Sequence, residues 1–247
     1  MGREFESVDN IEVDATPEQV WQAIATGPGI DSWFMGRNDV DPDNGVVRQS
    51  FGGYEPEHRV TEWEPMRHLA YRSDAPDGRF IAYEFLIEGR DRAGTVLRMA
   101  TSGFLPGDDW EAEYDAMTKG GALFVATLGT YLRHFAGRTA VPVTVFGPAY
   151  TDWDRTRATL FAALGLSGEP RPGDRVRVTP AGLEPIDGEV FFLNADTLGV
   201  RTADEILRLI KGFMGTVIAA HQLFGRTDAD AETAEHAWQS WLTKTLA

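Results

Sequence analysis

Residues 108–136 read DDWEAEYDAMTKGGALFVATLGTYLRHFA, and this stretch decides the fold that the sequence predicts. Its aromatic and apolar residues, with one glycine among them, recur at alternating spacings of four and three, which places them on one face of a helix. These positions are Trp110, Tyr114, Met117, Gly121, Phe124, Leu128, Tyr131 and Phe135. Asp108 and Asp109 suit the positive end of the helix dipole, and Gly137 follows as a stop signal. A helix of this length would span about 43 Å at about 1.5 Å per residue.

The apolar face of this helix combines large aromatic side chains with Gly120 and Gly121, which carry no side chain. A helix that lies over a cavity needs such missing bulk, whereas a helix on a filled core does not. The alternative is ordinary core packing, in which the glycines allow another backbone to approach closely. The helix alone leaves both interpretations open.

Before this helix, the sequence predicts shorter helices and several antiparallel strands. Thr16, Pro17 and Gln19 form a helix start, with an N-cap, a proline at the first helical position and a glutamine reaching back as in a capping box. The Gly-Pro-Gly at residues 27–29 is expected to end that helix, and a short helix is predicted at residues 30–34. Alternating apolar residues predict strands with one buried face. These strands cover residues 4–14, 46–51, 57–64, 68–73, 80–88 and 95–101.

The second half of the chain repeats this order of elements. A capping box at residues 151–154 predicts a helix that runs through residue 164, and a final helix is predicted at residues 228–246. The predicted strands cover residues 141–145, 175–179, 188–193, 198–202, 205–211 and 216–222. We therefore predict an α+β chain of two units, residues 1–137 and residues 138–247. Residue identity between the halves is too low to separate an internal duplication from a coincidence of pattern.

Composition limits the classes of partner. The chain of 247 residues has no cysteine, so it holds no disulfide and no cysteine-ligated metal. Its net charge of −15 argues against nucleic acid and anionic membrane surfaces as partners. The chain has no run of about 20 apolar residues and no leader-like segment. We expect a soluble, cytoplasmic protein.

No catalytic signature stands out in the sequence. It lacks a phosphate-binding loop, a dinucleotide-binding glycine pattern and a nucleophile elbow. The five histidines show no metal-ligand spacing, so we expect no metal, no cofactor and no assigned catalytic residue. Tyr83, Tyr114 and Tyr131 are polar groups that could serve acid–base chemistry in an apolar cavity. Arg98 has the opposite strand parity to Leu97 and is expected to point outward.

The first half resembles the SRPBCC superfamily, also described as START or Bet v 1-like proteins with a helix-grip fold. Within it, the chain is most similar to the branch named for the activator of the heat-shock protein 90 ATPase. The ordered segments that carry the resemblance are Ile11 to Trp21, Trp33-Phe34, Gly52-Gly53, Val60 to Pro65, Ser102-Gly103-Phe104 and the long helix with Gly120-Gly121. The second half resembles the same superfamily through residues 187–201 and its closing helix.

The resemblance implies a curved antiparallel sheet wrapped around a long helix, with a hydrophobic cavity between them, and a second, shorter helix-grip-like half. Members of the superfamily bind lipids, sterols, polyketides and aromatic hormones. Some cyclise or dehydrate polyketides, and others modulate chaperones. A few bacterial members protect their hosts from enediyne antibiotics by being cut at a cavity glycine. Fold alone does not choose among these functions.

We predict a protein that binds an apolar aromatic or polyketide-like small molecule, in natural-product biosynthesis or in self-resistance of the enediyne-sequestering or sacrificial type. The alternatives are an enzyme of the polyketide cyclase or aromatase type and a protein that modulates a chaperone. The predicted cavity residues are Trp33, Phe34, Trp63, Tyr83, Phe85, Met99, Phe104, Trp110, Tyr114, Met117, Gly120, Gly121, Phe124, Leu128 and Tyr131. Turnover would separate the enzyme from the binder, and cleavage of the chain would identify a sacrificial protein.

Overall fold

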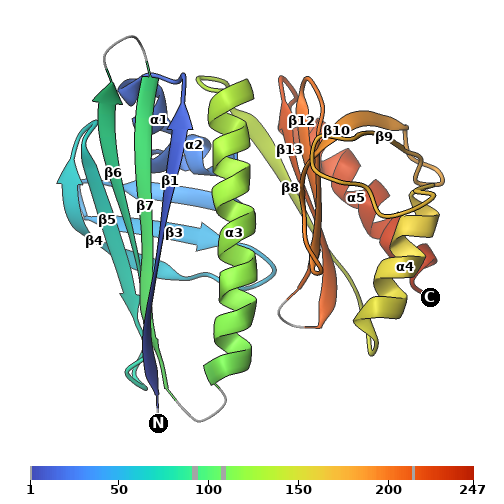
Figure 1. Ribbon diagram of the computed structural model, residues 1–247, viewed down its shortest axis with the longest axis horizontal. Helices are drawn as coiled ribbons and strands as arrows, with labels where there is room; N and C mark the ends of the chain where they lie inside the picture. Colours follow the sequence, from blue (N-terminus) through green and yellow to red (C-terminus); the bar gives the residue numbers. More distant parts are fainter. Residues whose placement is uncertain (1, 91–93, 107–109, 213–214) are drawn as a thin grey trace. The chain divides into compact units, whose positions relative to one another are not determined.

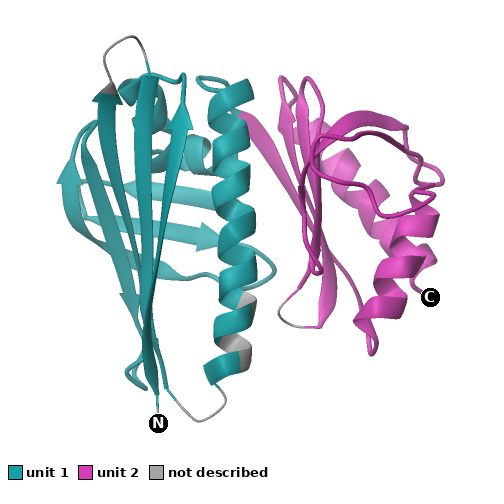
Figure 2. Ribbon diagram, in the orientation of Figure 1, with its two compact units in different colours: residues 1–139 teal, residues 140–247 magenta. Residues whose placement is uncertain are grey.

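The computed structural model describes residues 2–90, 94–106, 110–212 and 215–247 of the chain. Asp108 and Asp109, which the sequence places at the start of the long helix, lie outside the described residues. Contacts between residues divide the chain into two units, Met1–Thr139 and Ala140–Ala247, which Figure 2 shows in different colours.

The N-terminal unit is a seven-stranded antiparallel sheet with one long helix along it (Figure 1). Its elements are β1 (Arg3–Val13), α1 (Pro17–Ala25), α2 (Gly27–Asp31), β2 (Arg37–Asp41), β3 (Val46–Ser50), β4 (Glu57–Glu64), β5 (His68–Asp74), β6 (Phe80–Arg90), β7 (Gly94–Leu105) and α3 (Trp110–His134). The strand order is β1-β7-β6-β5-β4-β3-β2, so the first and last strands of the unit pair with each other. Helix α3 packs against these two strands. This arrangement confirms the predicted helix-grip architecture.

The start of α1 follows its sequence signals closely. Gln19 N donates to Thr16 Oγ1 over 3.3 Å, and Thr16 N donates to Gln19 Oε1 over 2.9 Å, which completes the capping box. Helix α1 ends at Ala25, just before the Gly-Pro-Gly stretch as predicted, but this stretch begins α2, so the short helix covers Gly27–Asp31 and the predicted bounds 30–34 were wrong. Pro28 suits the first turn of a helix, and Thr26 caps it by accepting from Gly29 N over 3.0 Å. The short helix therefore ends at Asp31, before the predicted pair Trp33-Phe34.

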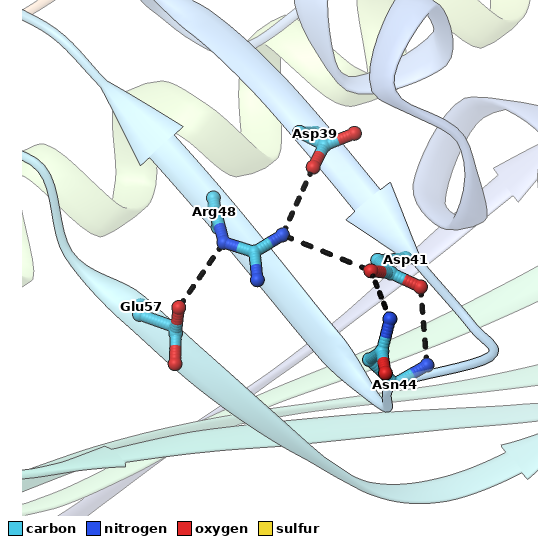
Figure 3. Close-up of polar contacts among 5 residues, drawn as sticks. All are labelled: Asp39, Asp41, Asn44, Arg48 and Glu57. Atoms are coloured by element: carbon cyan, nitrogen blue, oxygen red, sulfur yellow. Dashed lines mark hydrogen bonds and ion pairs between the residues drawn. The ribbon is translucent and has the colours of Figure 1, made fainter.

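Strand β2 was not predicted from the sequence. It is a polar edge strand, and a charged ladder links its side chains to β3 and β4. Arg48 on β3 lies 3.1 Å from Asp39, 3.9 Å from Asp41 and 3.1 Å from Glu57 (Figure 3). The hydrogen bond to Asp39 raises the pKa of Arg48, and hydrogen bonds from Asn44 lower the pKa of Asp41. A strand stabilised by ion pairs needs no alternation of apolar and polar residues. The alternation that predicts the other strands therefore does not predict β2.

The C-terminal unit is a six-stranded antiparallel sheet with two helices. Its elements are β8 (Ala140–Ala149), α4 (Trp153–Ala163), β9 (Arg175–Val178), β10 (Ile186–Leu193), β11 (Thr197–Arg201), β12 (Glu205–Lys211), β13 (Thr216–Phe224) and α5 (Asp228–Thr245). The strand order is β8-β13-β12-β11-β10-β9, so here too the first strand pairs with the last. Helix α5 packs on these two strands and contacts α4. The N-cap of α4 is Asp152, which accepts from Arg155 N over 3.1 Å, so the predicted capping box at residues 151–154 was wrong.

The face of this second sheet that carries α5 is filled with side chains. Its buried core includes Val143, Leu207, Trp238 and Leu242, all at most 4% exposed. A void of about 10 Å³ beside α4, which is lined in part by Trp153, holds no more than a water molecule. The face of the C-terminal sheet that carries α5 is therefore a filled core.

Candidate functional site

The packing of α3 changes along its length. Toward its C-terminal end, Leu128, Tyr131 and Phe135 are 0%, 2% and 1% exposed, as in a filled core. Toward its N-terminal end, Met117 is only partly buried and Tyr114 is 37% exposed, although spacing places both on the same helix face. One half of the grip is therefore filled, and the other half is open.

The sheet beneath α3 changes in the same direction. Phe85 and Leu97 are 1% and 0% exposed. Two residues along β6 from Phe85, Tyr83 is only partly buried, and its cross-strand partner Thr101 is also partly buried. Residues two apart on a strand share a face, so these side chains line one continuous surface. Helix and sheet thus open toward the same end of the unit.

Gly120 and Gly121 lie on the open half of α3. A Cβ atom added at either glycine would meet no other atom within 4 Å. Gly121 is exposed to solvent although its spacing from Met117, Phe124 and Leu128 places it on the apolar helix face. The glycine pair therefore borders open space, and it serves no close packing of one backbone against another.

Gly103 behaves differently from this pair. A Cβ atom at Gly103 would lie 2.6 Å from the ring of Phe5 and 2.7 Å from the carbonyl oxygen of Phe80. Phe5 in turn packs edge-on against Tyr114, with 5.7 Å between the ring centroids. Gly103 therefore makes room for a neighbouring ring, and its backbone is not open to a ligand.

A polar cluster lies on the inner face of the sheet, at the border between the two halves. His58 Nε2 and Gln49 Oε1 are 3.3 Å apart, and these residues are 2% and 7% exposed. The ring of His58 meets the rings of Tyr71 and Tyr83 edge-on, at centroid distances of 5.4 and 5.9 Å. Tyr71 and Tyr83 also contact each other at 5.4 Å. The sequence did not predict Gln49, His58 or Tyr71 as site residues. The shared strand parity of His58 and Val60 on β4 was a signal that the His58 side chain points inward.

Burial keeps this cluster uncharged at neutral pH. It lowers the pKa of His58 to about 4 and raises the pKa values of the Tyr71 and Tyr83 hydroxyl groups. Tyr54, which is 54% exposed, adds to the upward shift of the Tyr83 pKa. The site is therefore an apolar surface with a few neutral hydrogen-bonding groups.

Residues 14–133 match the family model described as Activator of Hsp90 ATPase homolog 1-like protein. The N-terminal unit is thus similar to this Aha1-like family, and we call it the Aha1-like domain. The match confirms the resemblance to the SRPBCC superfamily that the sequence suggested. It ends before the C-terminal unit begins.

Solved structures resemble the Aha1-like domain at low sequence identity. Protein MLL2253 from Mesorhizobium loti is 27% identical, with 52% of this chain and 96% of that chain covered and a TM-score of 0.44. The Aha1 dimer from Colwellia psychrerythraea is 21% identical, with 52% and 96% covered and a TM-score of 0.40. CalU16 from Micromonospora echinospora is 19% identical, with 52% and 74% covered and a TM-score of 0.40. No curated protein matches the sequence.

The residues that the sequence proposed for the cavity of the Aha1-like domain fall into three groups. Trp33, Phe85, Met99, Leu128 and Tyr131 are buried. Phe34, Trp63, Tyr83, Phe104, Trp110, Met117, Gly120 and Phe124 are partly buried. Tyr114 and Gly121 are exposed. The buried group belongs to the filled half, where the Trp33 indole donates to Ala23 O over 2.9 Å and the Tyr131 hydroxyl donates to Arg138 O over 2.8 Å.

Aromatic contacts bring part of this set together. Phe34 and Phe124 stack at a centroid distance of 4.3 Å, and Trp110 contacts Tyr114 at 6.2 Å. Trp63 instead contacts Trp21 of α1 at 5.1 Å.

Phe104 was predicted to line the cavity, but its side chain does not point there. It follows the inward-facing Gly103 in β7, so the strand period of two turns its side chain to the outer face of the sheet. Arg98 has the same outward parity, as the sequence predicted, and lies 3.8 Å from Glu84.

Within residues 2–90, 94–106, 110–212 and 215–247, no group of three or more histidine, aspartate or glutamate side chains is placed to hold a metal ion. Among the helices described, none is both long and apolar enough to span a membrane.

Proposed function

We propose that the Aha1-like domain binds an apolar, aromatic or polyketide-like small molecule in the open half of its grip. The observation that carries this proposal is the glycine pair, which faces open space on the apolar side of α3. Members of the SRPBCC superfamily bind small hydrophobic ligands, which agrees with such a use of the grip. A planar ligand placed there would cover Met117 and Phe124, which are only partly buried.

The first test is a titration of the full chain with flavonoids, tetracyclic polyketides, fatty acids and enediynes. Binding should quench tryptophan fluorescence saturably, because Trp110 lies at the open end of the grip, and it should raise the melting temperature. A folded protein that responds to no member of the panel would contradict the proposal.

A leucine in place of Gly121 is expected to weaken ligand binding at least tenfold, which corresponds to about 1.4 kcal/mol. The new side chain would occupy the open space, and it should not harm α3 because leucine favours a helix more than glycine does. Isothermal titration calorimetry on Gly121→Leu measures the loss.

The matched control is Ala122→Leu. This neighbouring residue is exposed and lies about 100° around α3 from Gly121, on the side away from the apolar face, so the affinity of the variant should equal that of the wild type. Equal affinities for wild type, Gly121→Leu and Ala122→Leu would place the ligand elsewhere.

A role in self-resistance is a second form of this proposal. The backbone of Gly120 and Gly121 is open, so the diradical form of an enediyne could abstract a hydrogen atom from a glycine Cα there. Dioxygen would then trap the carbon radical, and breakdown of the resulting peroxyl species would cut the chain. Intact mass spectrometry after incubation separates the two forms. An unchanged mass supports sequestration, and two fragments that meet near residue 120 support a sacrificial role.

An enzyme of the polyketide cyclase type is the alternative, and the neutral cluster around His58 and Tyr83 favours it. Such groups could hold an enol or move a proton inside an apolar site. Consumption of excess substrate by catalytic amounts of protein would support the enzyme, whereas a stoichiometric complex supports the binder.

A further inference from the structure

The hydrogen bond between Gln49 and His58 defines the proton positions on the histidine ring. Gln49 Oε1 is a carbonyl oxygen and can only accept, so His58 Nε2 carries the hydrogen and donates it over 3.3 Å. A neutral imidazole has one hydrogen, and burial keeps His58 neutral by lowering its pKa to about 4. Nδ1 therefore presents a lone pair and is a hydrogen-bond acceptor.

This acceptor has no partner in the described part of the chain. His58 is 2% exposed, and its Nδ1 atom is buried without a hydrogen bond. Buried polar groups are hydrogen-bonded in most proteins, so an orphaned acceptor in a fixed ring marks a place where a donor is missing. The rings of Tyr71 and Tyr83 hold the imidazole edge-on and keep its direction constant.

A row of tyrosines connects His58 with the open half of the grip. Exposure rises from Tyr71 at 3%, through the partly buried Tyr83, to Tyr54 at 54%. Tyr83 is in ring contact with His58, and Tyr54 is near enough to Tyr83 to influence its ionisation. A ligand that lies against Tyr83 therefore contacts a residue whose ring touches the ring of His58.

We propose that His58 is a specificity-determining residue whose Nδ1 accepts a hydrogen bond from the ligand, so that the domain selects hydroxylated aromatic molecules such as phenols and enols. This inference rests on the proposed binding function and adds to it the class of ligand. A hydrocarbon of the same shape would leave the acceptor orphaned, and an ionised carboxylate has no hydrogen to donate.

The test compares 2-naphthol with 2-methylnaphthalene, which have nearly the same shape and differ in the hydroxyl donor. Wild-type protein should bind 2-naphthol at least tenfold more tightly. His58→Phe, which keeps an aromatic ring and removes the acceptor, should lose this preference and bind 2-methylnaphthalene no more weakly than the wild type does. The matched control is His68→Phe, because His68 pairs with Glu84 on the outer face of the sheet, and its preference should persist.

A second measurement needs no variant. In protein labelled with ¹⁵N at histidine, the Nδ1 resonance of His58 should shift when 2-naphthol is added and stay in place when 2-methylnaphthalene is added. Binding of both compounds with equal affinity, or a preference that survives in a folded His58→Phe protein, would overturn the inference and leave the binding site standing. If neither compound binds the wild type while a member of the ligand panel does, the inference fails and the proposed function stands; if no member of the panel binds either, both fail.

Discussion

Lowering the pH from 7 to 4 is expected to reduce the unfolding free energy of the C-terminal unit by about 3 kcal/mol through His221 alone. This residue is 4% exposed in β13 and packs edge-on against Trp238 of α5 at a centroid distance of 5.1 Å. Neither ring nitrogen has a hydrogen-bond partner among the described residues. Burial first, and the charge of Arg208 second, lower its pKa from 6.5 to about 3.

The sign of the effect follows from proton uptake. The folded pKa of His221 lies below the unfolded value of 6.5, so the unfolded state binds the proton more readily. The contribution of His221 to stability is complete above pH 6.5 and is lost progressively as the pH falls toward about 3. Each unit of this difference is worth about 1.4 kcal/mol.

Urea denaturation of the wild type and of His221→Leu at pH 7 and pH 4 measures this contribution. The leucine variant should lose about 3 kcal/mol less on acidification, and at pH 7 it should match or exceed the wild type because it buries no orphaned nitrogen. His236→Ala is the control, since it removes an exposed histidine of the same unit and should not reproduce the effect of His221→Leu. If His221→Leu loses as much unfolding free energy between pH 7 and pH 4 as the wild type does, His221 is not the cause.

Alanine in place of Gly29 is expected to destabilise the N-terminal unit by about 3 kcal/mol. The added Cβ would lie 1.8 Å from the carbonyl oxygen of Gln22 and 2.7 Å from the Thr26 hydroxyl. That hydroxyl donates to Gln22 O over 2.8 Å and accepts from Gly29 N over 3.0 Å, so it joins the end of α1 to the start of α2. Because the closest obstacle is backbone, the two helices must move apart.

The measurement is the urea midpoint of Gly29→Ala compared with that of Gly120→Ala. The same chemical change at Gly120 meets no atom within 4 Å, so it should cost nothing and add up to about 1 kcal/mol through helix propensity. If Gly120→Ala loses as much stability as Gly29→Ala, the space beside Gly120 is not open, and the proposed ligand site is contradicted.

Local signals in the sequence account for most of the elements. The strands β4 and β12 occupy the predicted residues 57–64 and 205–211, and the capping box of α1 forms as predicted. These signals succeed because a strand period, a helix period or a cap involves residues only a few positions apart. Strand β2 carries no such local signal, because ion pairs with charged side chains on the neighbouring strands stabilise it.

The sequence predicts which residues belong to the candidate site, but it does not show which of them border open space. The pattern of α3 names Gly120, Gly121 and the aromatic residues on one face, but it cannot tell whether that face is covered. Gly103 and Gly121 look equivalent in the sequence, yet the ring of Phe5 fills the space at Gly103 and nothing fills it at Gly121. The adjacent residues Trp33 and Phe34 also differ: Trp33 is buried in the filled core, whereas Phe34 is partly buried and contacts Phe124.

The sequence by itself determined the α+β class, the grip of a sheet on a long helix and the resemblance of the N-terminal unit to the Aha1-like family, because these depend on periodicities and motifs carried by contiguous residues. Only the tertiary structure decided which half of the grip is open and that His58 keeps an unpartnered nitrogen beside Gln49. Both properties depend on side chains from strands and a helix far apart in the chain. The space opposite a residue is set by what those distant segments place there, and no local pattern records it.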